Sequence, residues 1–374
     1  MRALRTPVGL FLLAAGIPFL VCFTFFVVSQ RRALLTEPEA YIAQLKRDGH
    51  APYMIFLSTW KHFLVRDAMC REAATVVIGS SRVREIDANL TGTSTCNVYV
   101  DGLAAQGFAR VASELPPAPA GDARVVYVGI DHFWLWIDRD PLSRVEIRLL
   151  DTSRGLWRMW AALRPLRYFT IADLLEAIRR VRQTDRRFED YNNVWYADGH
   201  LFHPRYYALK RAGQHRAVDR RAAEESATEL FGDVRVHDAN VRALESGLRA
   251  LHDKGYAVRA FWNPVSPAHI ASARRRFPRL FDESIVMVDR LARDLPLQRY
   301  VPAMETLDPT RFGCTDRDYA DATHADLDCL HRLFATIFPD TVRSTAMGRP
   351  DRVARALRLT AVNAGPRPGT PLPK

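Results

Sequence analysis

The sequence predicts an α/β fold with a mainly parallel sheet, and two alternating patterns support it. Short runs rich in β-branched and aromatic residues, each flanked by polar residues, glycine or proline, occur at Ala74–Ile78, Cys96–Val100, Arg124–Gly129 and Ala257–Trp262. Buried parallel strands have this composition because helices cover both of their faces. Patterns of helical period lie between these runs, at Gly107–Leu115 and Val241–Lys254. The alternation of strand and helix predicts one sheet with helices on both faces.

The N-terminal 32 residues contain an uncharged apolar stretch from Val8 to Ser29. About 20 apolar residues span a bilayer as a helix. The stretch is too long for the apolar part of a cleaved signal peptide, and no small-x-small cleavage site follows it. We therefore expect residues 1–32 to form a signal anchor, an uncleaved transmembrane helix. Two arginines precede the stretch and two follow it, which favours neither orientation strongly. We expect the rest of the chain outside the cytoplasm, with a cytoplasmic domain as the alternative.

Residues 33–345 are expected to form one α/β domain. Amphipathic helical spacing over residues 35–70 indicates a segment that leads from the membrane into that domain. Residues 142–221 interrupt the alternation, since they are rich in Arg, Trp and Tyr, and we expect a helical insertion that caps the sheet edge. Its aromatic side chains either stack on sugar rings or form a core. Residues 346–374 are rich in Arg, Pro and Gly and bury too little apolar area to fold, so we expect a disordered basic tail.

The chain has 374 residues, a net charge of +11 and a pI of about 9.7. A strongly basic chain suits nucleic acid or an anionic surface, but it equally suits arginines spread over solvated helices. No nucleic-acid-binding motif is present and the apolar N-terminus argues against a DNA-binding role, so no nucleic-acid partner is expected. The sequence also has no CxxC, no HExxH and no Cys/His cluster at zinc spacing. We expect no metal and no other cofactor.

Four of the five cysteines lie outside the predicted span, which contains Cys22: they are Cys70, Cys96, Cys314 and Cys329. Four cysteines allow three pairings that a sequence cannot separate. A bond between Cys314 and Cys329 would close a loop that contains Asp321 and His324, and an oxidising compartment would permit it. The alternative is four unpaired thiols that are partly buried.

Two short segments far apart in the sequence suggest covalent catalysis. The apolar run Val76–Ile78 ends abruptly in Gly79-Ser80-Ser81-Arg82, and Asp321-Ala322-Thr323-His324 lies near the end of the predicted domain. A serine where a buried strand turns into a helix is exposed at the strand's carboxyl end, where α/β folds place their active sites. An Asp three residues before a His can support a base that deprotonates such a serine. Taken singly, the segments are more typical of a helix-capping serine and of a capping Asp beside a surface His.

The segment Val77–Arg82 resembles the first block of the SGNH (GDSL-like) hydrolase superfamily, in the membrane-anchored variant that reads Gly-Ser-Ser-Arg. The resemblance implies a three-layer flavodoxin-like domain with Ser81 as the nucleophile. Gly102, which follows the second strand after Asn97, matches the glycine whose backbone N–H stabilises the oxyanion. Asp321-x-x-His324 resembles the last block, which implies that His324 is the general base and that Asp321 orients it. The resemblance covers about residues 70–340 without the insertion.

The third block departs from the family pattern Gly-x-Asn-Asp. Here Gly129-Ile130-Asp131 ends its strand at the corresponding place, with Asp131 where the family has an Asn that donates to the oxyanion. A carboxylate cannot donate a hydrogen bond unless it is protonated. Asp131 therefore orients Arg82, or binds a substrate hydroxyl, or leaves a smaller oxyanion hole. Asn263 follows the fourth strand and is a further substrate-pocket candidate, because loops at strand carboxyl ends line the crevice. The residues expected to bind the oxyanion or the substrate are thus Gly102, Arg82, Asn97, Asp131 and Asn263.

These expectations combine into a membrane-anchored extracytoplasmic esterase or O-acyltransferase that works through an acyl-Ser81 intermediate. The resemblance is to proteins of exopolysaccharide O-acetylation and teichoic acid D-alanylation. It implies an envelope polysaccharide or acylated glycan as substrate, the cytoplasmic (inner) membrane as location, and a membrane-bound O-acyltransferase as partner. The alternative is a non-catalytic envelope scaffold or polysaccharide-binding protein of the same fold. Hydrolysis and transfer differ only in which nucleophile reaches the acyl-enzyme, and the sequence leaves that open.

Overall fold

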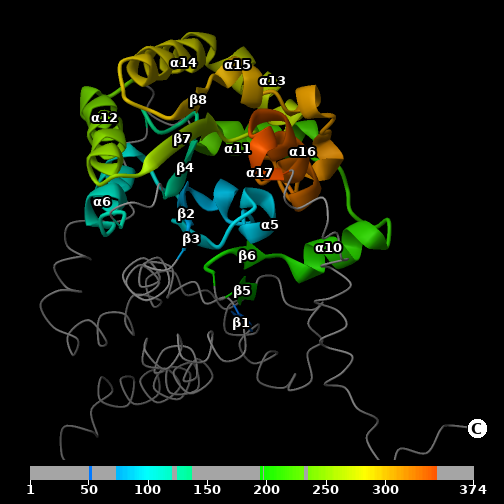
Figure 1. Ribbon diagram of the computed structural model, residues 1–374. Coiled ribbons are helices and arrows are strands. Elements are labelled where there is room, and N and C mark those ends of the chain that lie inside the picture. Colours follow the sequence, from blue (N-terminus) through cyan, green and yellow to red (C-terminus); the bar gives the residue numbers. More distant parts are fainter. Residues whose placement is uncertain are drawn as a thin grey trace, which may run out of the picture. The chain divides into compact units, whose positions relative to one another are not determined.

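A five-stranded parallel sheet organises the part of the chain that the computed structural model describes, namely residues 50–52, 73–119, 124–136, 194–196, 198–230 and 235–342. Its strands are β2 (Thr75–Gly79), β3 (Thr95–Tyr99), β4 (Val125–Ile130), β7 (Ala257–Trp262) and β8 (Arg299–Val301). They lie in the order β3-β2-β4-β7-β8, and every neighbouring pair is parallel (Figure 1). The predicted α/β fold with a mainly parallel sheet is confirmed.

The strand order reverses its direction between β2 and β4. From β2 the chain moves outward to β3 and then crosses back to β4 on the opposite side of β2. Loops diverge at such a reversal, and ligands of open α/β sheets bind outside the carboxyl ends of the strands there. Gly79 at the end of β2 pairs with Gly129 on β4, so the segments that follow these two glycines begin side by side.

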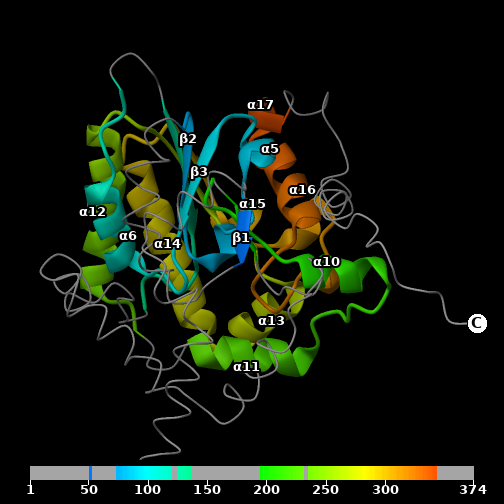
Figure 2. The same ribbon diagram turned by 90° about the horizontal axis from the view of Figure 1, so that it is seen from below.

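Helices cover both faces of the parallel sheet (Figure 2). One face carries α6 (Ala105–Glu114), α12 (Asp238–Asp253) and α14 (Pro278–Arg293). The other carries α5 (Ala88–Thr91), α15 (Ala303–Thr306), α16 (Leu327–Ile337) and α17 (Pro339–Val342). The helices α6 and α12 correspond to the two predicted ones, with α12 beginning three residues earlier than expected. Helix α13 (Pro267–Arg276) follows β7.

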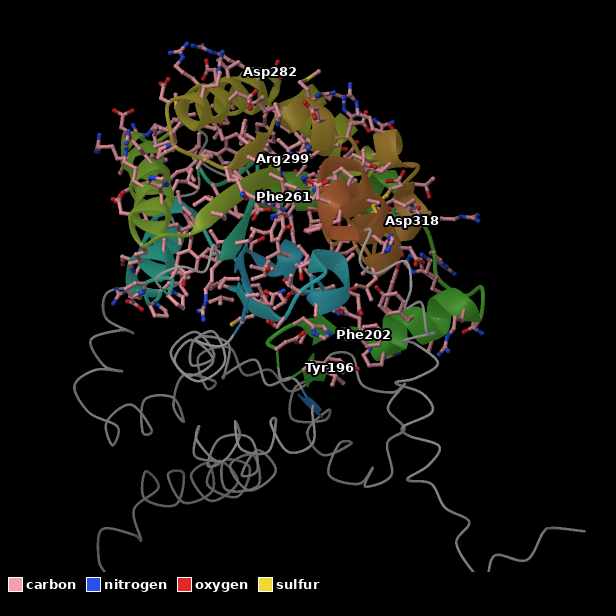
Figure 3. All side chains as sticks on the ribbon, viewed as in Figure 1. Tyr196, Phe202, Phe261, Asp282, Arg299 and Asp318 are labelled. Atoms are coloured by element: carbon pink, nitrogen blue, oxygen red, sulfur yellow. A yellow bond between two sulfur atoms is a disulfide. The ribbon has the colours of Figure 1, made fainter. Side chains whose placement is uncertain are left out.

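Aromatic packing fixes α16 on the sheet. The ring of Phe334 on α16 lies 5.4 Å from that of Tyr127 on β4 and 5.6 Å from that of Phe261 on β7. Phe261, labelled in Figure 3, is fully buried. Phe338, just after α16, contacts the same two rings at 4.9 and 5.9 Å. Aromatic pairs add about 0.5–1.5 kcal/mol each beyond the burial of their area, so this cluster holds the C-terminal half of α16 against β4 and β7.

A small antiparallel sheet accompanies the main one. Its strands are β1 (His50–Pro52), β5 (Val194–Tyr196) and β6 (Leu201–Phe202), in the order β1-β5-β6. The predicted helical character over 35–70 is wrong at β1, because Pro52 is unsuited to a helix interior and Ala51 pairs with Trp195, far away in the sequence. The insertion is also not purely helical: its described part contains β5 and β6, followed by α10 (Pro204–Arg211) and α11 (Arg220–Leu230).

Several predictions concern residues outside the described ones. They are the signal anchor over 1–32, most of the insertion and the tail over 346–374. Among the described residues, none of the helices has both the length and the apolar character that crossing a bilayer requires.

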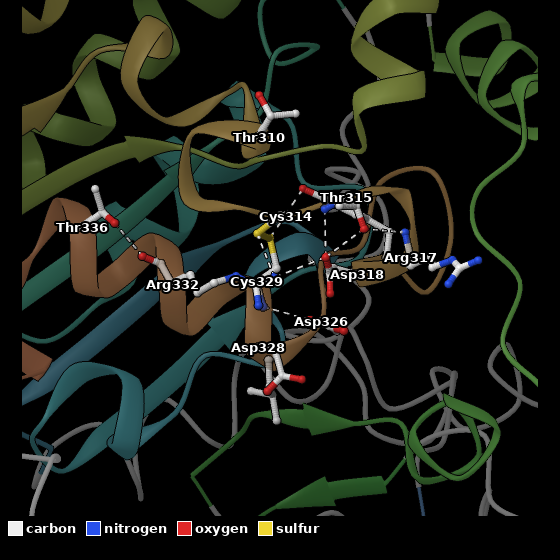
Figure 4. Close-up of a disulfide and its surroundings, with 12 residues drawn as sticks. Thr310, Cys314, Thr315, Arg317, Asp318, Asp326, Asp328, Cys329, Arg332 and Thr336 are labelled. Atoms are coloured by element: carbon white, nitrogen blue, oxygen red, sulfur yellow. Dashed lines mark hydrogen bonds and ion pairs between the residues drawn. A yellow bond between two sulfur atoms is a disulfide. The ribbon is translucent and has the colours of Figure 1, made fainter. Parts of the chain in front are cut away.

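The disulfide between Cys314 and Cys329 is present (Figure 4). It is one of the bonds that the sequence left open. It closes the loop that contains Asp321 and His324 and joins that loop to the first turn of α16. Cys96 is also disulfide-bonded, to a partner outside the described residues. The alternative of four unpaired thiols is therefore wrong.

Candidate active site

Ser81 lies two residues after the end of β2, at the first position of a single 3-10 turn, η3 (Ser81–Val83). The helix predicted after this strand is thus only one turn long, which is too short for an extended helix dipole. The hydroxyl of the preceding Ser80 is buried and accepts from the Arg82 N–H at 3.3 Å, whereas Ser81 is partly exposed. Gly79 is required here because a Cβ would lie 2.8 Å from the Val83 side chain. Of the two serines, Ser81 is the accessible one.

The structure brings together the three side chains that the sequence suggested for catalysis. His324 Nε2 lies 2.7 Å from Ser81 Oγ. On the other side of the ring, His324 Nδ1 lies 2.8 and 2.6 Å from the two carboxylate oxygens of Asp321. With Nδ1 donating to Asp321, the Nε2 lone pair faces the serine hydroxyl. This is the relation that a general base needs to a nucleophile.

The segment Asp321–His324 forms a tight turn held by its own aspartate. Asp321 Oδ1 accepts from the backbone N–H of Thr323 at 2.8 Å and from that of His324 at 3.1 Å. Ala320 N–H donates to the carbonyl of His324 at 2.9 Å, which closes the turn. Asp side chains favour this bonding to the backbone two or three residues onward. The short spacing of Asp and His therefore orients the imidazole locally, before any contact with Ser81.

Burial and charge set the protonation states of this pair. Burial alone would raise the pKa of Asp321, but the neighbouring His324, its hydrogen bond, the Thr323 N–H and the charge of Arg84 together hold that pKa below its usual range. Burial lowers the pKa of His324, the positive charge of Arg84 lowers it further, and Asp321 opposes both effects. At neutral pH the imidazole is neutral and the carboxylate is ionised, as proton abstraction from Ser81 requires.

Gly102 lies in the turn after β3 and is exposed. Its φ of 69° is in the left-handed region, and a Cβ there would meet nothing within 4 Å. Backbone conformation, rather than crowding, is therefore the reason for glycine at this position. The carboxyl ends of β3 and β2 lie at the same edge of the sheet, with Gly79 paired to Tyr99.

Asn97 lies within β3 and is fully buried. Its amide group donates to the carbonyl of Val83 at 2.7 Å and to that of Ile86 at 2.8 Å, while its Oδ1 accepts from Tyr99 N–H at 3.0 Å. Both amide hydrogens are thus used to hold the chain that follows Ser81. This geometry makes Asn97 a support of the nucleophile turn and leaves it no hydrogen for a substrate.

Asp131 pairs with Arg82, which was one of the three roles open to it. The Arg82 guanidinium lies 3.2 Å from Asp131 Oδ1, and Asn263 Nδ2 donates to the same oxygen at 2.9 Å. Asp131 Oδ2 accepts from Trp134 Nε1 at 3.1 Å. These side chains are buried, and the ring of Phe133 lies 4.7 Å beneath the guanidinium. Asp131 is an acceptor in every one of these contacts and offers no donor to an oxyanion.

Two buried histidines extend this polar cluster, and their position was not predicted. His269 Nε2 lies 3.2 Å from His132 Nε2. Burial, aided by the charge of Arg82, lowers the pKa of His269 to about 3, and burial also holds that of His132 well below its usual value. Both rings are neutral, so one donates and the other accepts. His132 follows the end of β4, and His269 lies in the first turn of α13.

The insertion supplies a second group that sequence patterns did not associate with the site. Glu85, four residues after Ser81, is buried and accepts from the hydroxyl of Tyr207 at 2.6 Å. His203 Nδ1 lies 3.3 Å from the other oxygen of Glu85. Burial raises the pKa of Glu85 to about 7. The only sequence signal was the nearness of Glu85 to Ser81, because nothing local links residues 203–207 to the strand ends.

The geometry suits transfer of the Ser81 proton to His324 while Ser81 Oγ attacks an electrophile. Among the described residues, no group of three or more His, Cys, Asp or Glu side chains is arranged to hold a metal ion. Compared with known proteins, the chain matches no family model and no curated protein sequence. The functional conclusion therefore depends on the residues of this site.

Proposed function

We propose that the protein is a serine esterase or O-acyltransferase with an SGNH-like fold. The observation that carries the proposal is the continuous chain of contacts from Ser81 Oγ through the His324 ring to the Asp321 carboxylate, at 2.7 and 2.6 Å. Such a chain is the minimum constellation for activating a serine, and it recurs on unrelated folds. The partial exposure of Ser81 leaves its hydroxyl open to a substrate.

In the first half of the reaction, Ser81 Oγ attacks the carbonyl carbon of an ester while His324 Nε2 takes its proton. The carbonyl oxygen becomes an oxyanion. As it collapses, the ester's C–O bond breaks and His324 returns the proton to the departing alkoxide, which leaves as an alcohol. The product is an acyl-Ser81 ester. Asp321 stabilises the imidazolium that exists between the two proton transfers.

In the second half, a water molecule or a sugar hydroxyl attacks the acyl-Ser81 carbonyl. His324 takes the proton of that nucleophile and returns it to Ser81 Oγ. Water as nucleophile gives a carboxylic acid, and a sugar hydroxyl gives a new ester. Donors for the oxyanion are the backbone N–H groups of Ser81 and Gly102, which follow two neighbouring strands. The acceptor-only Asp131 leaves this oxyanion hole without the third, side-chain donor.

The strand order supports an SGNH-like architecture. Numbered within the main sheet alone, the order is 2-1-3-4-5, which is the flavodoxin-like order. Ser81, Gly102, Asp131 and Asn263 follow the first four of these strands, so all four lie toward the same edge of the sheet. The N-terminal transmembrane helix over residues 1–32 belongs to the same proposal.

Substrate, partner and location follow from the resemblance to envelope-modifying proteins. We propose an envelope polysaccharide or acylated glycan as substrate, a membrane-bound O-acyltransferase as partner, and anchoring through residues 1–32 with the domain outside the cytoplasm. The disulfide-bonded state of Cys96, Cys314 and Cys329 supports that location, since disulfides persist in oxidising compartments.

Labelling with a serine-directed fluorophosphonate tests the proposal. The wild-type protein is expected to react at Ser81, Ser81→Ala to lose the label, and Ser80→Ala to keep it, because the Ser80 hydroxyl is buried against a backbone N–H. Mass spectrometry of the labelled peptide identifies the modified serine. Folded wild-type protein that stays unlabelled would contradict the proposal.

A scaffold that binds a polysaccharide without catalysis is the second candidate. The observation that favours it is Asp131, an acceptor where the family has a donor. Absence of labelling, together with retention on an immobilised envelope polysaccharide, is the result that this alternative expects.

A further inference from the structure

The hydroxyl of Tyr207 links the two turns that carry the nucleophile and the base. It donates to Glu85 Oε2 at 2.6 Å and accepts from the backbone N–H of Leu327 at 2.8 Å. Glu85 is four residues after Ser81, and Leu327 is three residues after His324. One oxygen atom on α10, in the insertion, thus bonds simultaneously to the segments that follow both reacting residues.

Other contacts from the described part of the insertion each hold one of the two turns. Leu201 N–H on β6 donates to the carbonyl of Arg84 at 2.7 Å, on the nucleophile side. Tyr206 Oη donates to Asp326 at 3.1 Å and Lys210 pairs with the same carboxylate, on the base side. The Tyr207 hydroxyl, in contrast, contacts both turns through one oxygen atom.

The Tyr207 side chain is held rigidly in place. Its ring is buried and stacks on that of Phe202, with centroids 4.7 Å apart and planes at 4° (Figure 3 labels Phe202 on β6). The ring of Tyr206 packs edge-on against it at 4.9 Å. Burial and the nearby Glu85 raise the pKa of Tyr207 well above its usual value, so the hydroxyl keeps its proton. A fixed, protonated hydroxyl is suited to hold two backbone segments at a constant separation.

We propose that Tyr207 is a positioning residue for catalysis, which holds the Ser81 turn and the His324 turn at the separation needed for proton transfer. The inference rests on the proposed function and assigns the insertion a part in it. Tyr207 does not touch the reacting atoms. It acts through Glu85 and Leu327, and a displacement of about 1 Å at a reacting pair is enough to lower a rate by about 100-fold.

Kinetics of fluorophosphonate labelling test the proposal with Tyr207→Phe, which removes only the hydroxyl. The concentration dependence of labelling separates the maximal rate constant, kinact, from the half-saturating concentration, KI. We expect kinact to fall at least about tenfold with KI unchanged, because the weakened contact between Ser81 and His324 affects the chemical step. Tyr256→Phe is the matched control: Tyr256 is also buried, but its hydroxyl donates to the Pro116 carbonyl, outside the site. It is expected to keep the wild-type kinact.

A purely structural role predicts a different pattern. Tyr207→Phe would then lower the melting temperature as Tyr256→Phe does and leave kinact at its wild-type value, which overturns the inference. If Tyr207→Phe does not fold, the same link is tested from the other end. Glu85→Gln retains an acceptor for the Tyr207 hydroxyl and Glu85→Leu does not, so kinact should fall only in Glu85→Leu, and equal values in both overturn the inference.

The two proposals fail separately. Wild-type protein that is folded but unlabelled contradicts the proposed function. Wild-type protein that labels at Ser81, with Tyr207→Phe labelling equally fast, contradicts only the role of Tyr207.

Discussion

His324 Nε2 lies 2.7 Å from Ser81 Oγ although 243 positions separate the two residues in the chain. Ser81 is placed by the end of a central strand, and His324 by a turn that leads into α16. The stacking of α16 on β4 and β7 through Phe334 and its neighbours brings that turn to the strand ends. The contact between His324 and Ser81 therefore depends on the packing of α16 against the sheet as well as on the two residues themselves.

Replacing Asp321 by Asn removes the negative charge beside the His324 imidazole while it keeps a side chain of the same shape. The imidazole would lose the carboxylate that accepts from Nδ1 and favours the imidazolium, so the labelling rate of Ser81 should fall by about 10²–10⁴-fold. The measurement is the rate of fluorophosphonate labelling at neutral pH. Asp308→Asn is the control, because Asp308 only caps a 3-10 turn and Asn caps equally well. A wild-type rate in Asp321→Asn would contradict the triad.

The labelling rate should depend on pH through His324. Burial and Arg84 hold the pKa of the imidazole below its usual value. The labelling rate should therefore rise with pH, with the midpoint of the rise below about 6.5, and should be constant above pH 7. Arg84→Gln removes a positive charge that disfavours the imidazolium, which raises this midpoint. The backbone hydrogen bonds of Arg84 to Ser81 and Leu201 survive the substitution.

The control for that shift is Arg279→Gln, the same change of charge on the exposed side of α14. It should leave the midpoint where it is. A midpoint that Arg84→Gln leaves unchanged, as Arg279→Gln does, would argue against His324 as the titrating base.

Asp131→Asn should destabilise the protein even though it restores the residue type of the SGNH pattern. The buried Arg82 guanidinium would lose its counter-ion, which typically costs about 3–5 kcal/mol. Urea unfolding measures the loss. The double variant Arg82→Met/Asp131→Asn should recover part of it, because no uncompensated charge remains buried. If Asp131→Asn keeps the wild-type stability and labels faster, the side chain at position 131 reaches the oxyanion, and Asn supplies the donor that Asp131 lacks.

Removal of the Cys314–Cys329 disulfide should lower stability by about 3 kcal/mol, the value for a closed loop of 15 residues. The double variant Cys314→Ser/Cys329→Ser is preferable to a reducing agent, because Cys96 is also disulfide-bonded. Since the loop carries Asp321 and His324, the labelling rate should fall as well. A variant with unchanged unfolding and unchanged labelling would show that the disulfide constrains neither.

Glu85 should make stability decrease with rising pH. Its pKa is raised from about 4.5 in the unfolded chain to about 7 by burial, so the folded protein binds the proton more tightly. This contribution is fully present below about pH 4.5, is lost as the pH rises through 7, and amounts to at most about 3 kcal/mol. Glu85→Gln does not titrate. The difference in unfolding free energy between wild type and Glu85→Gln should therefore change over this pH range, and a constant difference would contradict the shifted pKa.

Much of the framework was predictable because it is encoded in local patterns. Short apolar runs identified β2, β3, β4 and β7, and helical periodicity identified α6 and α12. The spacing Asp321-x-x-His324 predicted that this carboxylate supports this imidazole. The turn that joins them is local, since an Asp side chain bonds to backbone only two or three residues away. Ser81 was recognisable from its place after a strand, even though the helix expected there is only a 3-10 turn.

Contacts between distant segments were not predictable in the same way. The side chain of Asn97 satisfies two carbonyls after Ser81, and Asp131 neutralises Arg82, yet the sequence left both roles open. Nothing near Tyr207 indicates that its hydroxyl joins Glu85 to Leu327. The sequence by itself determined which residues had the chemistry of a serine nucleophile and its base, because strand ends and tight turns depend on neighbours in the chain. Only the tertiary structure decided which side chains meet, because burial pairs polar groups by their position in space.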